Sequence, residues 1–260
     1  SNDQDWLLIN ASPDILQQVR EDPPLQQARQ VRDSGIAAAL VIDAQIDHTT
    51  GLLMLHERGT PLPLYATPEV LGDLQDGFGL TKVLSHYAGF ELRPIALDGQ
   101  PLQVPFLADV EITPVPLTSQ PPPYSPHRGR PRPGDTIGLM MHDRRSDQRL
   151  FYAPGLGLME PSVEAAMRQA DVVMVDGTFW TEDEMVVNGL SRKLAAEMGH
   201  LPQSGLGGMI EHLDGLPAGK RKILIHINNT NPILREDSAE RAHLQAHGIE
   251  VAEDGMEIVL

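Results

Sequence analysis

Cysteine is missing from this sequence of 260 residues, so disulfide bonds and thiolate metal sites are excluded within it. Long hydrophobic runs are missing as well. The apolar stretch at residues 36–42 falls far short of the ~20 residues that span a bilayer. No signal peptide pattern opens the sequence. These absences favour a cytoplasmic location and predict no membrane segment.

Positive charge is scarce in this chain. It has 20 Lys and Arg residues against 36 Asp and Glu residues, which gives a formal net charge of −16. Such a charge repels phosphate backbones and anionic lipid headgroups, so we expect no nucleic-acid partner. One basic run, at residues 127–132, departs from this average. It can accept an acidic small molecule, although a solvated loop is the plainer interpretation.

The remaining composition suits a folded globular protein. Hydrophobic residues make up 41% of the sequence and charged residues 22%, both ordinary values. Because 260 residues is near the upper limit for one core, we predict a single domain over residues 1–260. The chain opens Ser1, Asn2, Asp3 without a methionine and enters a hydrophobic segment at Trp6. We therefore expect a natural N-terminal portion to precede this sequence.

Strand and helix patterns alternate along most of the chain, which favours the α/β class. Continuous apolar runs predict strands that are covered on both faces. Ser12 before Pro13, and Thr67 before Pro68, are predicted to cap helices. Strands are expected at residues 6–10, 35–42, 62–66, 136–141, 149–153, 172–175 and 223–225, and helices at 13–19, from 67, and at 162–169, 206–213 and 238–246.

Two stretches depart from this alternation. Residues 90–116 predict β-hairpins, with Asp98 and Gly99 as a turn pair. Residues 119–134 are rich in proline and form the clearest loop in the chain. Because this loop is long and stiff, we interpret it as a lid over a site.

Polar residues that can bind metals follow three apolar runs. These strand ends are residues 41–48, 175–178 and 224–231. In layered α/β folds, ligands gather where strands end and loops begin. The three ends can therefore converge on one site.

Asp47, His48 and His226 are the candidate metal ligands. Two imidazoles and one carboxylate on one face, with other positions open, are the ligand set of non-haem Fe(II) oxygenases. Zinc hydrolases use a similar set. Plainer alternatives stay open at this stage: Asp47 can cap a helix beside a buried histidine, and His226 can be a hydrogen-bonded core histidine.

Asp176 and His200 are further candidates. Asp176 precedes a glycine and can be a turn residue, an orienting partner or another ligand. His200 can act as an acid or base in a cleft, or it can be an exposed loop histidine.

The string at residues 42–51, Ile-Asp-Ala-Gln-Ile-Asp-His-Thr-Thr-Gly, resembles a degraded form of the His-x-His-x-Asp-His motif of the metallo-β-lactamase superfamily. Asp43 and Gln45 stand where that motif has its leading histidines. Strings at residues 10–14, 121–128, 152–157, 175–178, 197–200 and 226–234 resemble the coenzyme PQQ (pyrroloquinoline quinone) synthesis protein B family. The resemblance spans nearly the whole chain and implies a metallo-β-lactamase-like αββα four-layer sandwich.

The resemblance also implies a part in PQQ biosynthesis, in one of two forms. One is an iron-dependent hydroxylase that acts with O2 on the tyrosine of a Glu-Tyr-derived precursor. The other is a carrier that moves PQQ or its precursor toward the periplasm. We favour the hydroxylase because Asp43 and Gln45 remove the imidazole donors of one ion in a dinuclear zinc pair. The mononuclear site that remains suits Fe(II), although zinc or manganese can replace it in a crystal, and plain hydrolysis is disfavoured.

In this hypothesis Asp47, His48 and His226 hold Fe(II), and Asp176 or His200 orients the phenol or moves its proton. Asp43 and Gln45 form polar surroundings for the ligands. The expected substrate-binding residues are Tyr124, His127, Arg128, Arg130 and Asn229. Expected partners are the precursor or PQQ, other PQQ biosynthesis proteins and a second copy in a homodimer. Family members also carry an N-terminal segment with a Cys-x-Cys-x-x-Cys cluster, and this sequence starts after it.

Overall fold

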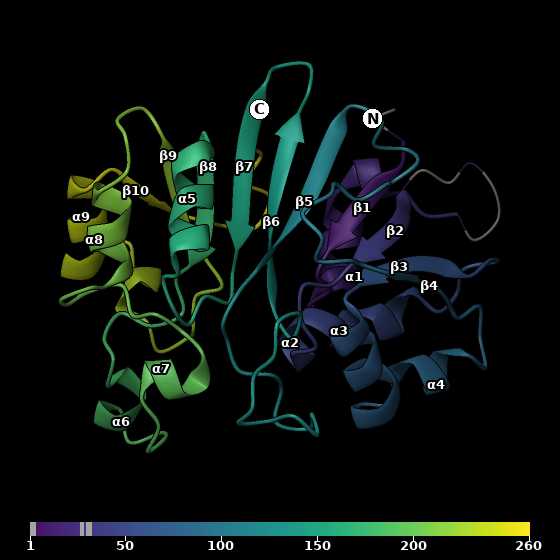
Figure 1. The fold of residues 1–260 in the computed structure, drawn as a ribbon, viewed down its shortest axis with the longest axis horizontal. Helices are drawn as coiled ribbons and strands as arrows, with labels where there is room; N and C mark the ends of the chain where they lie inside the picture. The colour runs from purple at the N-terminus through teal and green to yellow at the C-terminus, as the bar shows by residue number, and fades with distance from the viewer. Residues whose placement is uncertain (1–3, 27–28, 30–32) are drawn as a thin grey trace. The chain divides into compact units, whose positions relative to one another are not determined.

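The computed structural model describes residues 4–26, 29 and 33–260 (Figure 1). The expectation about the chain start concerns Ser1 to Asp3, which lie outside the described residues. The chain divides into two compact units. The first comprises Ser1–Asp109 and Pro121–Ile137, and the second comprises Val110–Gln120 and Gly138–Leu260. The single domain expected over residues 1–260 stays a prediction.

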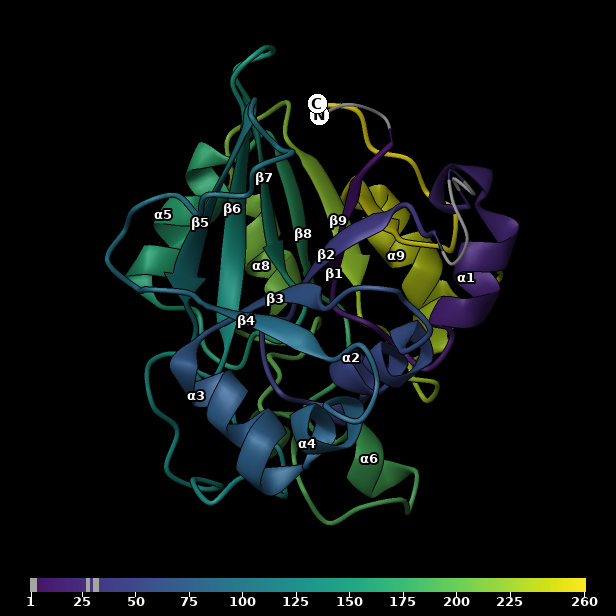
Figure 2. The ribbon, with the colours of Figure 1, turned by 90° about the vertical axis from the view of Figure 1, so that its right-hand side faces the viewer.

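In its described residues, the first unit is built on a four-stranded parallel sheet. The strand order is β1 (Trp6–Ile9), β2 (Ile36–Leu40), β3 (Leu62–Ala66) and β4 (Phe90–Pro94), as Figure 2 shows. Its helices are α1 (Ile15–Glu21), η1 (Pro23–Leu25), α2 (Ile46–Thr49), η2 (Thr50–Leu55), α3 (Pro68–Gly72), η3 (Asp73–Gly77) and α4 (Leu80–Leu84). Strand β2 is buried almost throughout, as its unbroken apolar sequence predicts.

Two helix caps were predicted in this unit, and one of them is confirmed. Thr67 caps α3 as predicted, because its hydroxyl accepts the backbone N–H of Val70. The prediction for Ser12 was wrong. Helix α1 begins at Ile15, and the Ser12 hydroxyl accepts the backbone N–H of Asp14 in the turn that precedes it.

The second unit is built on a six-stranded sheet in the order β10-β9-β8-β7-β6-β5. Its strands are β5 (Val110–Pro116), β6 (Ile137–Asp143), β7 (Gln148–Ala153), β8 (Val172–Asp176), β9 (Arg221–Ile225) and β10 (Ile249–Val251). Strands β6 and β7 form an antiparallel pair as predicted, and β7 to β10 run parallel. The hairpins predicted at residues 90–116 were wrong, because β4 pairs with β3 in one sheet and β5 lies in the other.

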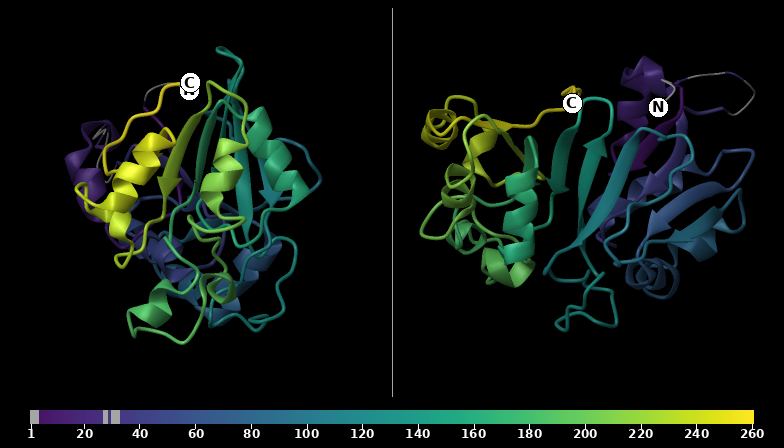
Figure 3. Two further views of the ribbon diagram at one scale, coloured as in Figure 1. Left: turned by 90° about the vertical axis from the view of Figure 1, so that its left-hand side faces the viewer. Right: turned by 45° about the horizontal axis from the view of Figure 1, so that its top comes forward.

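Helices of the second unit cover one face of its sheet. Figure 3 shows α5 (Pro161–Gln169), α8 (Met209–Asp214) and α9 (Ala239–Ala246) over that face. Short helices α6 (Glu184–Val187), α7 (Ala195–Met198) and η4 (Pro232–Leu234) complete the unit. The core between helices and sheet includes the fully buried Phe151, Met167 and Leu224. Burial of this core stabilises the packing of the helices on the sheet.

The proline-rich segment belongs to the first unit from Pro121 onward. The Ser125 hydroxyl donates to the buried Asp73 carboxylate over 2.8 Å, and the Thr67 hydroxyl donates to the Gly134 carbonyl over 2.6 Å. Burial raises the pKa of Asp73, partly countered by the Ser125 hydrogen bond. The segment is therefore fastened at Ser125 and at Gly134. The interpretation of this segment as a lid stays a prediction.

Among the helices within the described residues, not one combines the length and the apolar character needed to cross a membrane.

Candidate metal centre

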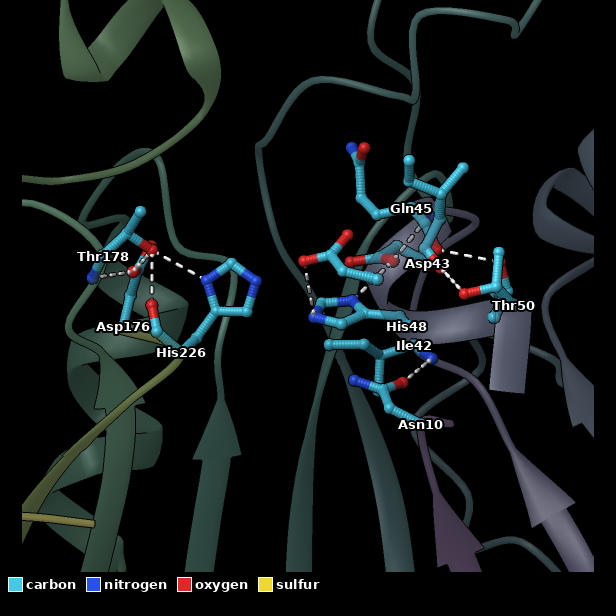
Figure 4. Close-up of polar contacts among 12 residues, drawn as sticks. Asn10, Ile42, Asp43, Gln45, His48, Thr50, Asp176, Thr178 and His226 are labelled. Carbon is cyan, nitrogen blue, oxygen red and sulfur yellow. Dashed lines mark hydrogen bonds and ion pairs between the residues drawn. The ribbon is translucent and has the colours of Figure 1, made fainter. Parts of the chain in front are cut away.

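The segment that follows β2 brings Asp43 and His48 together in the first unit. Asp43 is 3% exposed, and its Oδ1 accepts the backbone N–H of Gln45 over 2.9 Å. This turn places Gln45 at the N-cap of α2. One helical turn later, Nδ1 of His48 lies 2.8 Å from the same carboxylate oxygen (Figure 4). Asp43 therefore holds the Nδ1 proton of His48, and the acceptor nitrogen of this ring is Nε2.

Asp47 lies beside the acceptor nitrogen of His48. Its Oδ2 is 3.9 Å from His48 Nε2, and its side chain is 55% exposed, whereas that of His48 is 8% exposed. Two atoms that both bind one ion at about 2.1 Å must lie within about 4.2 Å of each other, so this spacing fits a pair of ligands. The interpretation of Asp47 as a helix cap was wrong, because α2 begins at Ile46 with Gln45 as its N-cap.

The second unit gathers Asp176, Thr178, His200 and His226. Asp176 ends β8, and His226 follows the last residue of β9, its parallel neighbour. His226 has a φ of 57°, a left-handed conformation that is uncommon for residues other than glycine, although His, Asn and Asp adopt it more often than other residues do. Such a conformation at a strand end often marks a functional constraint. His200 arrives from the loop after α7, where its Nδ1 lies 2.7 Å from Asp176.

Asp176 is fully buried and uses all of its acceptor positions. Its Oδ2 accepts from the backbone N–H of Leu156 over 2.9 Å and from Nδ1 of His200. Its Oδ1 accepts from the backbone N–H of Thr178 over 2.9 Å and from the Thr178 hydroxyl over 2.5 Å. Burial alone would raise the pKa of Asp176, but the charge and hydrogen bond of His200, with His226 and Thr178, outweigh burial and leave this pKa below its usual range.

The Thr178 hydroxyl links the two histidines to Asp176. It has one proton to donate, and the carboxylate of Asp176 is a stronger acceptor than the carbonyl of His226, which lies 3.0 Å away. The hydroxyl oxygen can then accept a proton from Nδ1 of His226, at 2.8 Å (Figure 4). His226 is thereby held with Nδ1 protonated and Nε2 as the acceptor. This is the arrangement that a metal-binding imidazole requires.

Asp176, His200 and His226 offer ligand atoms that lie within 4.8 Å of one another. The two imidazole rings are stacked, with centroids 5.4 Å apart and an angle of 20° between their planes. A carboxylate has about four acceptor positions, and those of Asp176 are taken by the four contacts above. Asp176 is therefore better suited to orient His200 and Thr178 than to bind an ion. His200 lies 17% exposed beside it, where it can exchange a proton.

The residues predicted to bind substrate lie in two places. Tyr124, His127, Arg128 and Arg130 are on the proline-rich segment of the first unit, and Asn229 is exposed in the turn after β9 of the second. Three of these side chains donate hydrogen bonds to backbone carbonyls of the first unit. The Tyr124 hydroxyl donates to the Ala44 carbonyl, Arg128 donates to the Pro121 carbonyl, and Arg130 donates to the Pro126 carbonyl over 3.3 Å.

Sequence reasoning gave three residues that shape this centre no part in it, although it expected Asn231 to cap the turn that follows, as it does for η4. Thr178 collects the contacts described above. Gln203 and Asn231 are buried, and their side-chain amides both donate to the carbonyl of Gly177. A Cβ on Gly177 would lie 2.9 Å from the carbonyl oxygen of Ile225, so the close approach of β8 and β9 requires glycine there. The Asp-Gly-Thr string was the signal available in the sequence.

Comparison with known proteins places these residues in a family context. Residues 5–227 match the family model described as a beta-lactamase superfamily domain. The chain is 58% identical over 259 residues to a protein of Azoarcus sp. (strain BH72) named coenzyme PQQ synthesis protein B, covering 100% of this chain and 85% of that protein. It is 61% identical over 254 residues to a protein of the same name from Cupriavidus taiwanensis, covering 98% and 83%.

Solved structures agree with this similarity. The Zn2+-bound PqqB from Methylobacterium extorquens superposes with a TM-score of 0.88 at 34% identity, covering 100% of this chain and 85% of that chain. A diphosphatase from the PhnP family superposes with a TM-score of 0.63 at 16% identity, covering 98% and 80%, and shows the fold alone. The predicted metallo-β-lactamase-like α/β fold is confirmed.

Proposed function

The chain belongs to the coenzyme PQQ synthesis protein B family of the metallo-β-lactamase superfamily, and from this premise we propose that it is a metal-dependent hydroxylase of PQQ biosynthesis. The proposed substrate is a Glu-Tyr-derived precursor, whose tyrosine ring gains one oxygen atom from O2. The proposed metal is a single Fe(II) ion, with Asp47, His48 and His226 as its protein ligands. Zinc and manganese fit the same donors, so they compete in isolated protein.

The observation that supports this proposal most is the way both histidines are oriented. In His48 the Nδ1 position is held by Asp43, and in His226 it is held by the Thr178 hydroxyl. Each ring therefore presents Nε2 as a donor for an ion, with an oxygen behind it that fixes the tautomer. With the carboxylate of Asp47 beside His48, the donor set is one oxygen and two nitrogens. This set leaves further positions open for substrate and O2.

The state of Asp43 favours one ion over two. Asp43 and Gln45 occupy the positions where the superfamily motif has its leading histidines. Asp43 is buried, and Oδ1 of its carboxylate already accepts from His48 and from the Gln45 backbone. Asp43 thus orients His48. Because Asp43 and Gln45 replace two histidines, a dinuclear hydrolytic centre would lack two of its imidazole donors.

When bound, Fe(II) supplies the redox chemistry through which O2 can hydroxylate an aromatic ring. Each turnover transfers one oxygen atom to the ring carbon and releases the other as water. The balance requires two electrons and two protons from an added reductant. At the ring, one C–H bond is replaced by a C–OH bond, so the proton that leaves the carbon is balanced by the proton that the new hydroxyl oxygen carries.

The protein residues orient the substrate and move its phenolic proton. His200 is positioned as the base that takes this proton, because the buried Asp176 holds its Nδ1 and stabilises the charged imidazolium that results. The carboxylates of the precursor can pair with guanidinium groups, which match them through two parallel hydrogen bonds. Arg130 is exposed and retains donors beyond its contact with Pro126, and His127, Arg128 and Asn229 are further contacts in this proposal.

We expect protein loaded anaerobically with Fe(II) to consume O2 when given the Glu-Tyr dipeptide and ascorbate as reductant. Mass spectrometry should show a product heavier than the dipeptide by one oxygen atom, derived from 18O2 when that isotope is supplied. His48→Ala, treated identically, should give no such product. An unchanged dipeptide mass with iron fully loaded would contradict the hydroxylase. PQQ binding that is tight and indifferent to His48→Ala would then favour the carrier.

A further inference from the structure

The proline-rich segment and the residues directly after it form hydrogen bonds with residues 42–44, which precede the candidate metal ligands in the sequence. Near its start, the Tyr124 hydroxyl donates to the carbonyl of Ala44. Just beyond its end, the backbone N–H of Ile137 donates to the carbonyl of Ile42 over 3.0 Å, and Thr136 forms an antiparallel bridge with Asp43. Residues 42–44 are thus held from both ends of one segment, within the first unit. They immediately precede the turn that carries Asp47 and His48.

The ring of Tyr124 is fixed by its surroundings. It lies against Gly77, where a Cβ would come within 2.8 Å of the Tyr124 ring, and beside Phe78, with ring centroids 5.5 Å apart. The next residue, Ser125, is buried and donates to Asp73. Burial raises the pKa of Tyr124, and the nearby carboxylates of Asp73 and Asp43 add to this effect. The phenol therefore keeps its proton at neutral pH and remains a donor.

Ala44 is a sensitive place to receive this hydrogen bond. It is fully buried and lies between Asp43, which holds His48, and Gln45, which is the N-cap of α2. The carbonyl of Ala44 belongs to the peptide bond between Ala44 and Gln45. Its orientation therefore sets the direction in which the turn from Asp43 to His48 begins.

We propose that Tyr124 is a positioning residue for the candidate metal ligands, which fixes the peptide between Ala44 and Gln45 and thereby the arrangement of Asp43, Asp47 and His48. This role differs from the substrate contact expected from the sequence, because the hydroxyl is directed at the backbone of its own unit. Its link to metal binding rests on the proposed function above. The proline-rich segment then acts as a brace for the ligand turn.

Hydrogen exchange of the metal-free chain tests the brace without any ion. Tyr124→Phe keeps the ring against Gly77 and removes only the hydroxyl. We expect the amides of residues 44–49 to exchange about 10-fold faster in this variant, the effect of losing one net hydrogen bond. The matched control is Tyr65→Phe, which removes a hydroxyl that donates to the carbonyl of Gln103 over 3.3 Å in the same unit. In this control, the amides of residues 44–49 should exchange at the wild-type rate.

Co2+ binding then tests the effect on the ligands. Tyr124→Phe should weaken Co2+ binding roughly 10-fold, within the range seen when partners behind metal ligands are removed, and should alter the visible absorption of the bound Co2+. Tyr65→Phe should match the wild type in both. Unaltered exchange at residues 44–49 and unaltered Co2+ binding in Tyr124→Phe would overturn the inference. If His48→Ala binds Co2+ as the wild type does, the proposed metal centre is refuted. The hydrogen-exchange result tests the positioning role of Tyr124 separately.

A second variant guards against misfolding of Tyr124→Phe. Gly77→Ala retains the Tyr124 hydroxyl but places a Cβ 2.8 Å from the Tyr124 ring, so the ring must shift from its present position. It should accelerate exchange at the same residues, and a Gly77→Ala protein with wild-type exchange there would overturn the inference.

Discussion

Replacing His48 with alanine is expected to lower the affinity of the chain for Fe(II) or Co2+ by more than about 100-fold. Loss of a direct ligand should exceed the roughly 10-fold to 100-fold cost of losing a partner behind one. Hydroxylation of the precursor should become undetectable, because Asp47 and His226 alone cannot complete the donor set. Metal content after dialysis and isothermal titration with Co2+ measure the effect.

The His48 experiment needs a histidine control from the same unit. His86 is exposed, and His86→Ala should bind metal as the wild type does. His48 is buried and bonded to Asp43, so its loss should also cost about 1–3 kcal/mol of unfolding free energy. Circular dichroism should therefore establish that His48→Ala is folded at the assay temperature. A folded His48→Ala protein with wild-type metal affinity would contradict the centre as we describe it.

Thr178→Val should impair both the fold and the metal centre. Valine has nearly the shape of threonine but cannot donate to Asp176 or accept from Nδ1 of His226. The buried carboxylate loses one partner, at a cost of about 1–3 kcal/mol in unfolding free energy. His226 also loses the oxygen that fixes its tautomer, so metal affinity should fall roughly 10-fold to 100-fold.

Thr178→Ser is the matched control, because serine keeps the hydroxyl and loses only a methyl group. It should retain metal affinity within about 3-fold of the wild type. Denaturant unfolding and Co2+ titration of the two variants separate the hydroxyl from the packing. If valine and serine behave alike, the hydroxyl does not orient His226 and our account of this residue fails.

Local chemistry explains which parts of the fold the sequence could predict. The Thr67-Pro68 pair carries its own cap and first helical turn, and the apolar run before Asp43 is sufficient to predict a buried strand. Pairing between strands depends on residues far apart in the chain. Strand β4 extends the first sheet, whereas β5 joins the second, and neither the alternating pattern of β5 nor the Asp98-Gly99 turn reveals that choice.

The candidate site was predictable where strand ends deliver charged side chains. Asp43, His48, Asp176 and His226 all follow apolar runs, so their positions at strand ends could be expected. The role of Thr178 could not, because a hydroxyl shared by residues 176, 200 and 226 leaves no periodic signal. The contact between Tyr124 and Ala44 spans 80 positions and is equally invisible in the pattern of residues.

The most direct test of the metal centre is anomalous diffraction from crystals of the chain loaded with Fe(II) under anaerobic conditions. We predict one strong iron peak within about 2.3 Å of a carboxylate oxygen of Asp47 and of Nε2 in both His48 and His226. A peak coordinated by Asp176, His200 and His226 without Asp47 and His48, or iron bound away from all of these residues, would contradict the account.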